Sequence, residues 1–307
     1  MLRYAIRRLL GAIPTLLVLI TLAFFMIRMA PGGPFDSEKS LPPEIEANLN
    51  AAYHLDEPLP VQYGRYLLNI LQGDFGPSFQ YNDFSVNELI ASGFSVSLTI
   101  GGLALLLAVV LGSLLGIIAA LRQNKPTDYA VMTVAMTGIS IPNFVIAPLL
   151  ILLFAVSLGW LPAGGWDDGG PAKMVLPVIA LALPYVAYIA RLMRSSMIET
   201  LRSNYIRTAR AKGLSEPMII WRHALKPAFM PVLSFLGPAA AAIITGSVVI
   251  EKIFGIPGLG RYFVQGALNR DYTLVMGVVV FYGMLIIAFN FIVDLLYGAL
   301  DPKVRYD

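Results

Sequence analysis

The chain has 307 residues, of which 57% are hydrophobic and only 13% are charged, whereas soluble domains contain about 45–50% apolar and about 25% charged residues. Its apolar residues form long blocks, which exclude a water-soluble globular fold and predict an all-α integral membrane protein. The net charge of +3 is too small and too scattered for a nucleic-acid-binding protein, and the absence of cysteine excludes disulfides, thiolate metal sites and a cysteine nucleophile.

About six apolar segments are long enough to cross a bilayer as helices. A crossing needs about 20 apolar residues, because a helix rises about 1.5 Å per residue and the hydrocarbon core is about 30 Å thick. The predicted spans are residues 9–27, 95–121, 129–158, 174–190, 228–250 and 274–300. We interpret the first as an uncleaved anchor rather than a signal peptide, since its apolar run is long and no small-x-small cleavage site follows it.

Lysine and arginine gather on one side of these spans and thereby predict the orientation. The basic residues of that side are Arg3, Arg7, Arg8, Arg122, Lys125, Lys303 and Arg305, together with those of the loop 194–227. Basic residues near span ends resist translocation, so this side is predicted to be cytoplasmic, with both termini on it. Residues 31–94 are mainly acidic among their charged positions and are expected to form an external helical subdomain after the anchor. The predicted division is therefore an N-terminal region 1–94 and a membrane core 95–307.

Two proline sites in the predicted spans are candidates for a pathway through the membrane. Pro142, which Asn143 follows, and Pro184 each remove a backbone hydrogen bond that neighbouring groups or a water-lined cavity must replace. The spans that contain them are therefore expected to flank a pathway. Kinks that serve only helix packing explain these prolines equally well.

Asn290 and Asp294 lie one helical turn apart in the last predicted span. A polar side chain inside a membrane is costly and is by default suspected of a function. Asp294 is close to the cytoplasmic end of the span, where we expect it mainly to anchor the helix by pairing with Lys303 or Arg305. A role in the pathway is the alternative for both residues.

The glycine-rich stretch 255–260 superficially resembles a phosphate-binding loop. It contains a proline and no Lys-Ser or Lys-Thr pair follows it, so it lacks the groups that bind phosphate in such loops. We expect a tight external turn, or a re-entrant loop that lines the pathway.

The predicted cytoplasmic loop 194–227 has the pattern of two short helices. Met197, Leu201, Tyr205 and either Thr208 or Ala209 recur at helical spacing, which predicts an amphipathic helix on the membrane surface. Gly213 is expected to end this first helix in a left-handed conformation. Ser215 is a candidate N-cap for the second helix, and Pro227 is expected to disfavour helix at Lys226. This element is suited to docking in a groove of another protein. A basic membrane-surface loop that only follows the positive-inside rule explains the composition equally well.

The sequence YIRTARAKGL at 205–214, followed by HALKPA at 223–228, resembles the cytoplasmic EAA loop of binding-protein-dependent ABC importer permeases. The general family pattern begins with Glu-Ala-Ala, whereas this chain has Arg207-Thr208-Ala209, which is typical of the peptide and nickel branch. The further matching motifs are IPNF at 141–144, VIEKIFGIPGLG at 249–260, RDY at 270–272, DLLY at 294–297 and DPK at 301–303. In the N-terminal region, APGGP at 30–34 and QGDFGPS at 72–78 resemble the B-type subunit of oligopeptide permeases.

This resemblance implies a type I ABC importer permease fold in the bacterial inner membrane, surrounded by lipid. It also implies a homologous C-type permease, two cytoplasmic ABC ATPases, a periplasmic peptide-binding protein and a peptide substrate as partners. The residues that it assigns to ATPase coupling are Arg207, Thr208, Ala209, Arg210, Ala211, Lys212, Gly213 and Leu214. No cofactor or metal site and no catalytic residue is expected, and the chain has no Walker A motif, so ATP hydrolysis is assigned to the partners. A dipeptide or nickel permease, or an ion-coupled secondary transporter, is the alternative.

Overall fold

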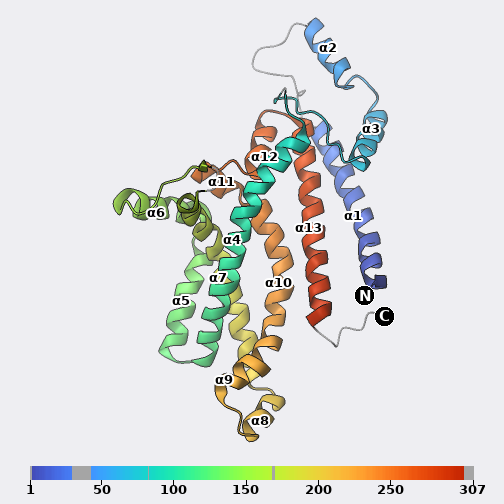
Figure 1. The fold of residues 1–307 in the computed structure, drawn as a ribbon. Coiled ribbons are helices and arrows are strands. Elements are labelled where there is room, and N and C mark those ends of the chain that lie inside the picture. Colours follow the sequence, from blue (N-terminus) through green and yellow to red (C-terminus); the bar gives the residue numbers. More distant parts are fainter. Residues whose placement is uncertain (1, 30–42, 82, 168–169, 301–307) are drawn as a thin grey trace.

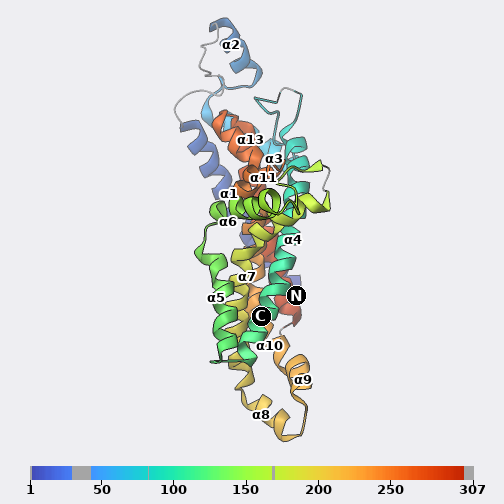
Figure 2. The ribbon, with the colours of Figure 1, turned by 90° about the vertical axis from the view of Figure 1, so that its left-hand side faces the viewer.

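The computed structural model describes residues 2–29, 43–81, 83–167 and 170–300. In chain order the helical elements are α1 (Leu2–Met29), α2 (Pro43–Ala52), α3 (Leu59–Leu71), α4 (Val86–Leu121), α5 (Pro126–Ser140), α6 (Asn143–Leu150), the π-helix η1 (Ile151–Ser157), α7 (Pro171–Leu201), α8 (Asn204–Ala211), α9 (Glu216–Met218), the π-helix η3 (Ile219–Ala224), α10 (Leu225–Gly246), α11 (Val248–Phe254), α12 (Leu259–Leu268) and α13 (Tyr272–Leu300). The molecule is elongated, with α2 and α3 at one end and α8 and α9 at the other (Figures 1 and 2). The all-α class is confirmed.

Five helices in the described residues are long and apolar enough to cross a membrane, and a bent pair makes a sixth candidate. The five candidate spans are Leu10–Met29, Val86–Leu121, Pro171–Leu201, Glu216–Thr245 and Tyr272–Leu296. The sixth joins Pro126–Ser140 to Asn143–Ser157. Each predicted span overlaps one of these elements, because the length of an apolar run is read directly from the sequence.

The third predicted span, 129–158, is not one straight helix. Its two halves, α5 and α6–η1, meet at an angle of 106°. Pro142 has no N–H group and disfavours helical geometry in the residue before it, so Ile141 is extended, with φ −102° and ψ 121°. The prediction was therefore wrong about the shape of this segment, and α6 lies across the molecule rather than along it (Figure 2).

The second span begins nine residues earlier than the predicted residue 95. Ser85 and Glu88 form a capping box, in which the Glu88 N–H donates to Ser85 Oγ at 3.2 Å and the Ser85 N–H donates to the Glu88 carboxylate at 2.8 Å. This cap supplies partners for N–H groups that the first helical turn leaves unpaired, so α4 starts at Val86.

More of the segment 194–227 is helical than the sequence predicted. Helix α7 continues to Leu201, and Met197 belongs to its buried end rather than to a separate amphipathic helix. The expected stop at Pro227 is also wrong, because α9, η3 and α10 continue through it as one helical rod. Pro227 lies in the first turn of α10, and the wide π-turns of η3 end three residues before it, where its missing N–H interrupts the helical ladder.

The centre of the molecule is held by close packing of α4, α5 and α7. A Cβ atom on Gly116 of α4 would lie 2.6 Å from the Ala190 carbonyl oxygen, and one on Gly138 of α5 would lie 2.5 Å from the Leu183 carbonyl oxygen. Both contacts are shorter than a side chain allows, so glycine lets these helices approach α7 closely, as small residues do in membrane helix packing. Helices α4 and α7 share one continuous core with residues of α6, η3 and α10, and α5 packs on α7 through Gly138.

A second, smaller core joins the start of α4 to α12 and α13. Next to it, the buried Asp271 caps α13 by accepting from the Leu274 N–H at 3.1 Å, and it also accepts from the Ser78 hydroxyl at 2.5 Å. The loop that follows α3 is thereby fixed to the N-terminal end of α13. On the other side of α13 lies α1, whose Leu19 contacts Gly283.

Candidate coupling surface and pathway residues

Helix α8 projects from one end of the molecule and is anchored by two of its own side chains (Figure 1). Ile206 and Ala209 lie one turn apart and are buried in the main core, with 0% and 7% of their surface exposed. Gly213 has φ +77°, so the left-handed conformation predicted for it is confirmed. The Gly213 N–H donates to the Arg210 carbonyl oxygen at 2.9 Å, which closes the end of the helix.

The remaining residues of α8 form an exposed and basic surface. We define the coupling surface as the exposed residues Asn204, Tyr205, Arg207, Thr208, Arg210, Ala211, Lys212 and Gly213. Of the eight predicted coupling residues, Ala209 is buried within this chain and Leu214 is half-buried, so neither lies on the coupling surface. Tyr205 of the apolar repeat is exposed, whereas Met197 and Ala209 of the same repeat are buried.

Arg210 is held by an acidic residue beyond the turn. Its Nε lies 2.7 Å from Glu216 Oε1 and its Nη2 lies 3.2 Å from Oε2, a forked contact that joins α8 to α9. The nearby carboxylate raises the pKa of Arg210. The side chains of Arg207 and Lys212 make no ion pair with any residue that the structure describes. These two cations of the coupling surface are therefore exposed and not neutralised by the described residues.

A buried ion pair supports the base of this region, and sequence reasoning missed it. Asp128 at the start of α5 is 1% exposed and accepts from Arg194 of α7 through two contacts, Nε to Oδ1 and Nη2 to Oδ2, both 2.6 Å. The Asn124 N–H adds a third hydrogen bond at 2.9 Å. The sequence shows only that Asp128 is an acidic residue close to the basic residues Arg122 and Lys125. It does not indicate which basic residue pairs with Asp128.

The candidate pathway residues do not form one site. Pro142 and Asn143 lie at the bend between α5 and α6, whereas Asn290 and Asp294 lie on α13, on the opposite side of α4 and α7 (Figures 1 and 2). Pro184 is partly exposed within α7. The Asn143 Oδ1 atom is buried without a hydrogen bond in the described structure.

The two polar residues of α13 have structural neighbours. Asn290 faces α10, where a Cβ atom on Gly237 would lie 3.1 Å from its Oδ1. Asp294 pairs with Arg8 of α1, with 2.9 Å between Oδ2 and Nη1. The expected partners Lys303 and Arg305 lie outside the described residues, so that expectation stays a prediction. Within the described residues Asp294 meets Arg8, because α1 and α13 pack along each other.

The glycine-rich turn after α11 closes over a buried carboxylate that was not predicted. Glu251 is 1% exposed and accepts from the hydroxyls of Ser97 at 2.6 Å and Ser247 at 2.5 Å. A Cβ atom on Gly258 would lie 2.2 Å from the Glu251 Cδ, so only glycine allows the turn to sit this close. Gly255 has φ +66° and starts the turn. A tight turn is confirmed.

A cavity of about 480 Å³ opens beside this turn, between α11 and α12. Its walls include two cations, Lys252 and Arg261, and two amides, Gln265 and Asn269. Val264 and Leu268 add apolar surface. None of these residues was among the pathway candidates, because their convergence depends on the fold of the turn.

Comparison with known proteins places these features in context. Residues 112–306 match the family described as binding-protein-dependent transport system inner membrane component, and residues 1–100 match the N-terminal region of such a membrane component. The chain is 58% identical over 306 residues to the oligopeptide transport system permease protein OppB of Escherichia coli K12, covering 100% of both chains. It is 50% identical to the dipeptide transport system permease protein DppB of Bacillus subtilis 168, covering 99% of this chain and 98% of that protein.

Two solved structures share the fold at low sequence identity. A chain of the MetNI methionine ABC transporter, in inward-facing conformations, has a TM-score of 0.59 at 18% identity and covers 69% of this chain and 96% of that one. A chain of an amino acid ABC transporter with histidines has a TM-score of 0.55 at 20% identity, covering 69% and 94%. These two likenesses confirm the predicted ABC permease fold.

Proposed function

Because the chain belongs to the family of binding-protein-dependent transport system inner membrane components, we propose that it is the permease subunit of an ATP-driven importer of oligopeptides. The oligopeptide permease relatives match the whole chain, which supports this cargo. In this proposal the chain and a homologous C-type permease enclose the pathway, two cytoplasmic ATPases drive it, and a periplasmic binding protein delivers the peptide. The chain itself has no catalytic role.

The observation that carries the coupling role is the way α8 is mounted. Its buried face is fixed by Ile206 and Ala209, so its exposed face moves with the helices beneath it. On one side it leads into the 31-residue α7, which is about 45 Å long at about 1.5 Å per residue. On the other side it leads into the continuous rod Glu216–Gly246. A displacement of α8 is therefore transmitted as rigid-body movement of two membrane helices.

The charge of the coupling surface indicates the kind of groove that receives it. Arg210 forms an ion pair with Glu216, whereas Arg207 and Lys212 are exposed and form no ion pair with the described residues. A groove with carboxylates on the ATPase would pair with these two cations and would fix the register of the contact. Thr208 and Ala211 add little bulk to the exposed face, which favours close approach.

The proposed location is the inner membrane, with both termini cytoplasmic. The N-terminal end of α1 and the C-terminal end of α13 point toward the end of the molecule that carries α8 (Figure 1). The basic residues of the loop 194–227 lie at that same end, in agreement with the positive-inside rule. Helices α2 and α3 then face the periplasm, where the binding protein docks.

The cavity beside α11 is the part of this chain best suited to line the pathway. It combines apolar walls with Lys252, Arg261 and two amides, and it opens at the surface of this chain. Every unmodified peptide carries a carboxylate and backbone amides whatever its sequence, so such groups allow contact without selection of side chains. Helix α6, which begins at the α5–α6 bend, packs beside α11 in the main core, so the bend adjoins this cavity's flank in the proposal.

Transport in proteoliposomes tests this function directly. The complete transporter is purified with its co-purifying subunits and reconstituted, and uptake of radiolabelled trialanine is measured with the binding protein, with and without ATP. We expect uptake to require ATP, to be lost with an ATPase variant that lacks its Walker A lysine, and to survive a protonophore. Uptake that does not depend on ATP and is abolished when the proton gradient is removed would contradict the assignment as an ABC permease. Preferential uptake of dipeptides or Ni²⁺ would contradict the oligopeptide cargo alone.

A further inference from the structure

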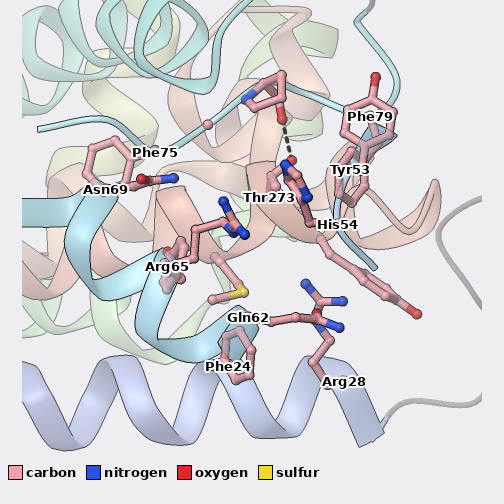
Figure 3. A pocket seen from close by; sticks show the side chains of 15 residues that line it. Phe24, Arg28, Tyr53, His54, Gln62, Arg65, Asn69, Phe75, Phe79 and Thr273 are labelled. Carbon is pink, nitrogen blue, oxygen red and sulfur yellow. Dashed lines mark hydrogen bonds between the residues drawn. The ribbon is translucent and has the colours of Figure 1, made fainter. Parts of the chain in front are cut away.

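A small polar cavity lies at the outer end of α1, away from the coupling surface and from the cavity beside α11. It has a volume of about 190 Å³ and lies between α1, α3, the loop after α3 and the start of α13 (Figure 3). Pockets for drug-sized ligands are usually about 300 Å³ or larger. The size therefore suits a group such as a phosphate ester and excludes an oligopeptide.

The cavity contains a cation that this part of the chain does not neutralise. The Arg28 guanidinium carbon lies 5.3 Å from the Phe24 ring centre and 5.8 Å from that of Tyr272, and its Nε is buried without a hydrogen bond. No carboxylate among the described residues forms an ion pair with Arg28. Arg65, which also lines the cavity, is by contrast paired with Glu57 at 2.6 Å. Among the described residues, Arg28 is thus the arginine of this cavity whose positive charge is not balanced by a carboxylate.

Two further polar groups in its wall lack hydrogen-bond partners among the described residues. The Tyr66 hydroxyl is buried without a hydrogen bond, and burial raises the pKa of Tyr66, which keeps the hydroxyl protonated and able to donate. Gln62 is 8% exposed, and its Nε2 donates to the carbonyl oxygens of Leu55 at 3.0 Å and Glu57 at 2.7 Å, whereas its Oε1 has no donor. Figure 3 shows Arg28 extending from α1 toward Gln62 of α3. Buried polar groups are normally paired, so three unpaired ones around one cavity indicate a missing ligand.

The position of the cavity identifies the source of that ligand. Arg28 is the next-to-last residue of the 20-residue apolar segment Leu10–Met29, which is about as long as the hydrocarbon core is thick. Its guanidinium therefore lies at the depth of lipid headgroups. Both helices carry exposed apolar side chains, with Met26 and Met29 close to Arg28 in the sequence of α1 and Leu68 on α3. Acyl chains fit such a surface, and a soluble anion gains nothing from it.

We propose that this cavity binds the headgroup of an anionic phospholipid in the leaflet on the α2 and α3 side. Arg28 and Tyr66 donate to phosphate oxygens, and Gln62 Oε1 accepts from a headgroup hydroxyl such as that of phosphatidylglycerol. Arginine suits this role because its planar fork matches two phosphate oxygens. The bound lipid then ties α1 to α3 and to the start of α13.

Native mass spectrometry of the complete purified transporter, titrated with phosphatidylglycerol in detergent, tests the site. Arg28→Met is expected to lower the apparent lipid affinity about tenfold and Tyr66→Phe about threefold, as fits the loss of hydrogen bonds to a charged group. Arg28→Lys keeps the charge without the fork and is expected to lie between wild type and Arg28→Met. Arg122→Met, which removes an exposed arginine at the opposite end of the molecule, is the matched control and should leave lipid binding unchanged.

A second measurement separates a ligand site from a packing defect. Tyr66→Phe removes a hydroxyl that has no described partner, so in lipid-depleted detergent the variant should unfold at the wild-type temperature or above it. Its unfolding temperature should rise less than that of wild type when phosphatidylglycerol is added. Wild-type lipid affinity in Tyr66→Phe and Arg28→Lys would overturn the proposal even if Arg28→Met failed to fold. Displacement of the lipid by millimolar inorganic phosphate or trialanine would assign the cavity to a soluble anion instead.

Discussion

Replacement of Arg194 by methionine is expected to destabilise the transporter more than any exposed charge substitution in this chain. The change leaves the Asp128 carboxylate, 1% exposed, without the two charge-assisted hydrogen bonds of 2.6 Å that now compensate its burial. Breaking a buried ion pair in this way costs about 3–5 kcal/mol. Because the Arg194 side chain is itself 27% exposed, water screens part of the pair, and we expect the lower end, about 3 kcal/mol. At about 2–4 °C per kcal/mol the unfolding temperature falls by about 6–12 °C.

The assay is thermal unfolding of the purified complex, followed by intrinsic fluorescence. Three variants make it specific. Asp128→Asn should lower the unfolding temperature less than Arg194→Met. It leaves the partly exposed Arg194 without its partner, whereas Arg194→Met leaves the buried Asp128 carboxylate unpaired. The double variant Asp128→Asn with Arg194→Met should regain much of the unfolding temperature that Arg194→Met loses, because no buried charge remains. Arg191→Met, on the exposed side of α7, is the control and should change the unfolding temperature by less than about 2 °C. The reasoning is refuted if Asp128→Asn is as harmful as Arg194→Met or if the double variant recovers nothing.

Three further predictions concern other parts of the chain. Arg207→Glu reverses an exposed charge of the coupling surface, so ATP-driven peptide uptake should fall about tenfold or more while thermal stability stays unchanged; normal uptake would remove this residue from the ATPase contact. Gly258→Ala places a Cβ atom where the Glu251 carboxyl group lies, so it should lower the unfolding temperature clearly, and a neutral result would mean that the turn adapts. Asp294→Asn weakens a partly exposed ion pair with Arg8, so its effect should stay within about 1 kcal/mol, and a larger loss of stability would indicate that the pair is shielded by lipid.

The apolar blocks of the sequence determine the class of the fold and the rough place of each span. A run of about 20 apolar residues has no stable alternative to a membrane helix, so this inference needs no tertiary information. The ends of the helices were predicted less accurately than their approximate places, because helix ends depend on local hydrogen bonds. The Ser85 capping box starts α4 earlier than hydropathy indicates, and the helix continues from η3 into α10, whose first turn contains Pro227.

The coupling segment shows which features can be predicted from a local sequence pattern and which cannot. Gly213 was assigned its left-handed conformation from sequence, because that conformation is a property of one residue and its neighbours. The apolar repeat did not decide which residues of α8 are buried. Ala209 is buried whereas Tyr205 is exposed, since the inward face is chosen by contact with η3 and the end of α7 rather than by hydrophobicity within eight residues.

The sequence by itself determined that this protein lies in a membrane, where its basic loops gather and which segment carries the motif of its family. Only the tertiary structure decided which charges neutralise one another, such as Asp128 with Arg194 and Asp294 with Arg8. These partners lie 66 and 286 residues apart. Helical periodicity relates residues three or four positions apart, whereas ion pairs, buried carboxylates and cavities depend on which distant helices pack together.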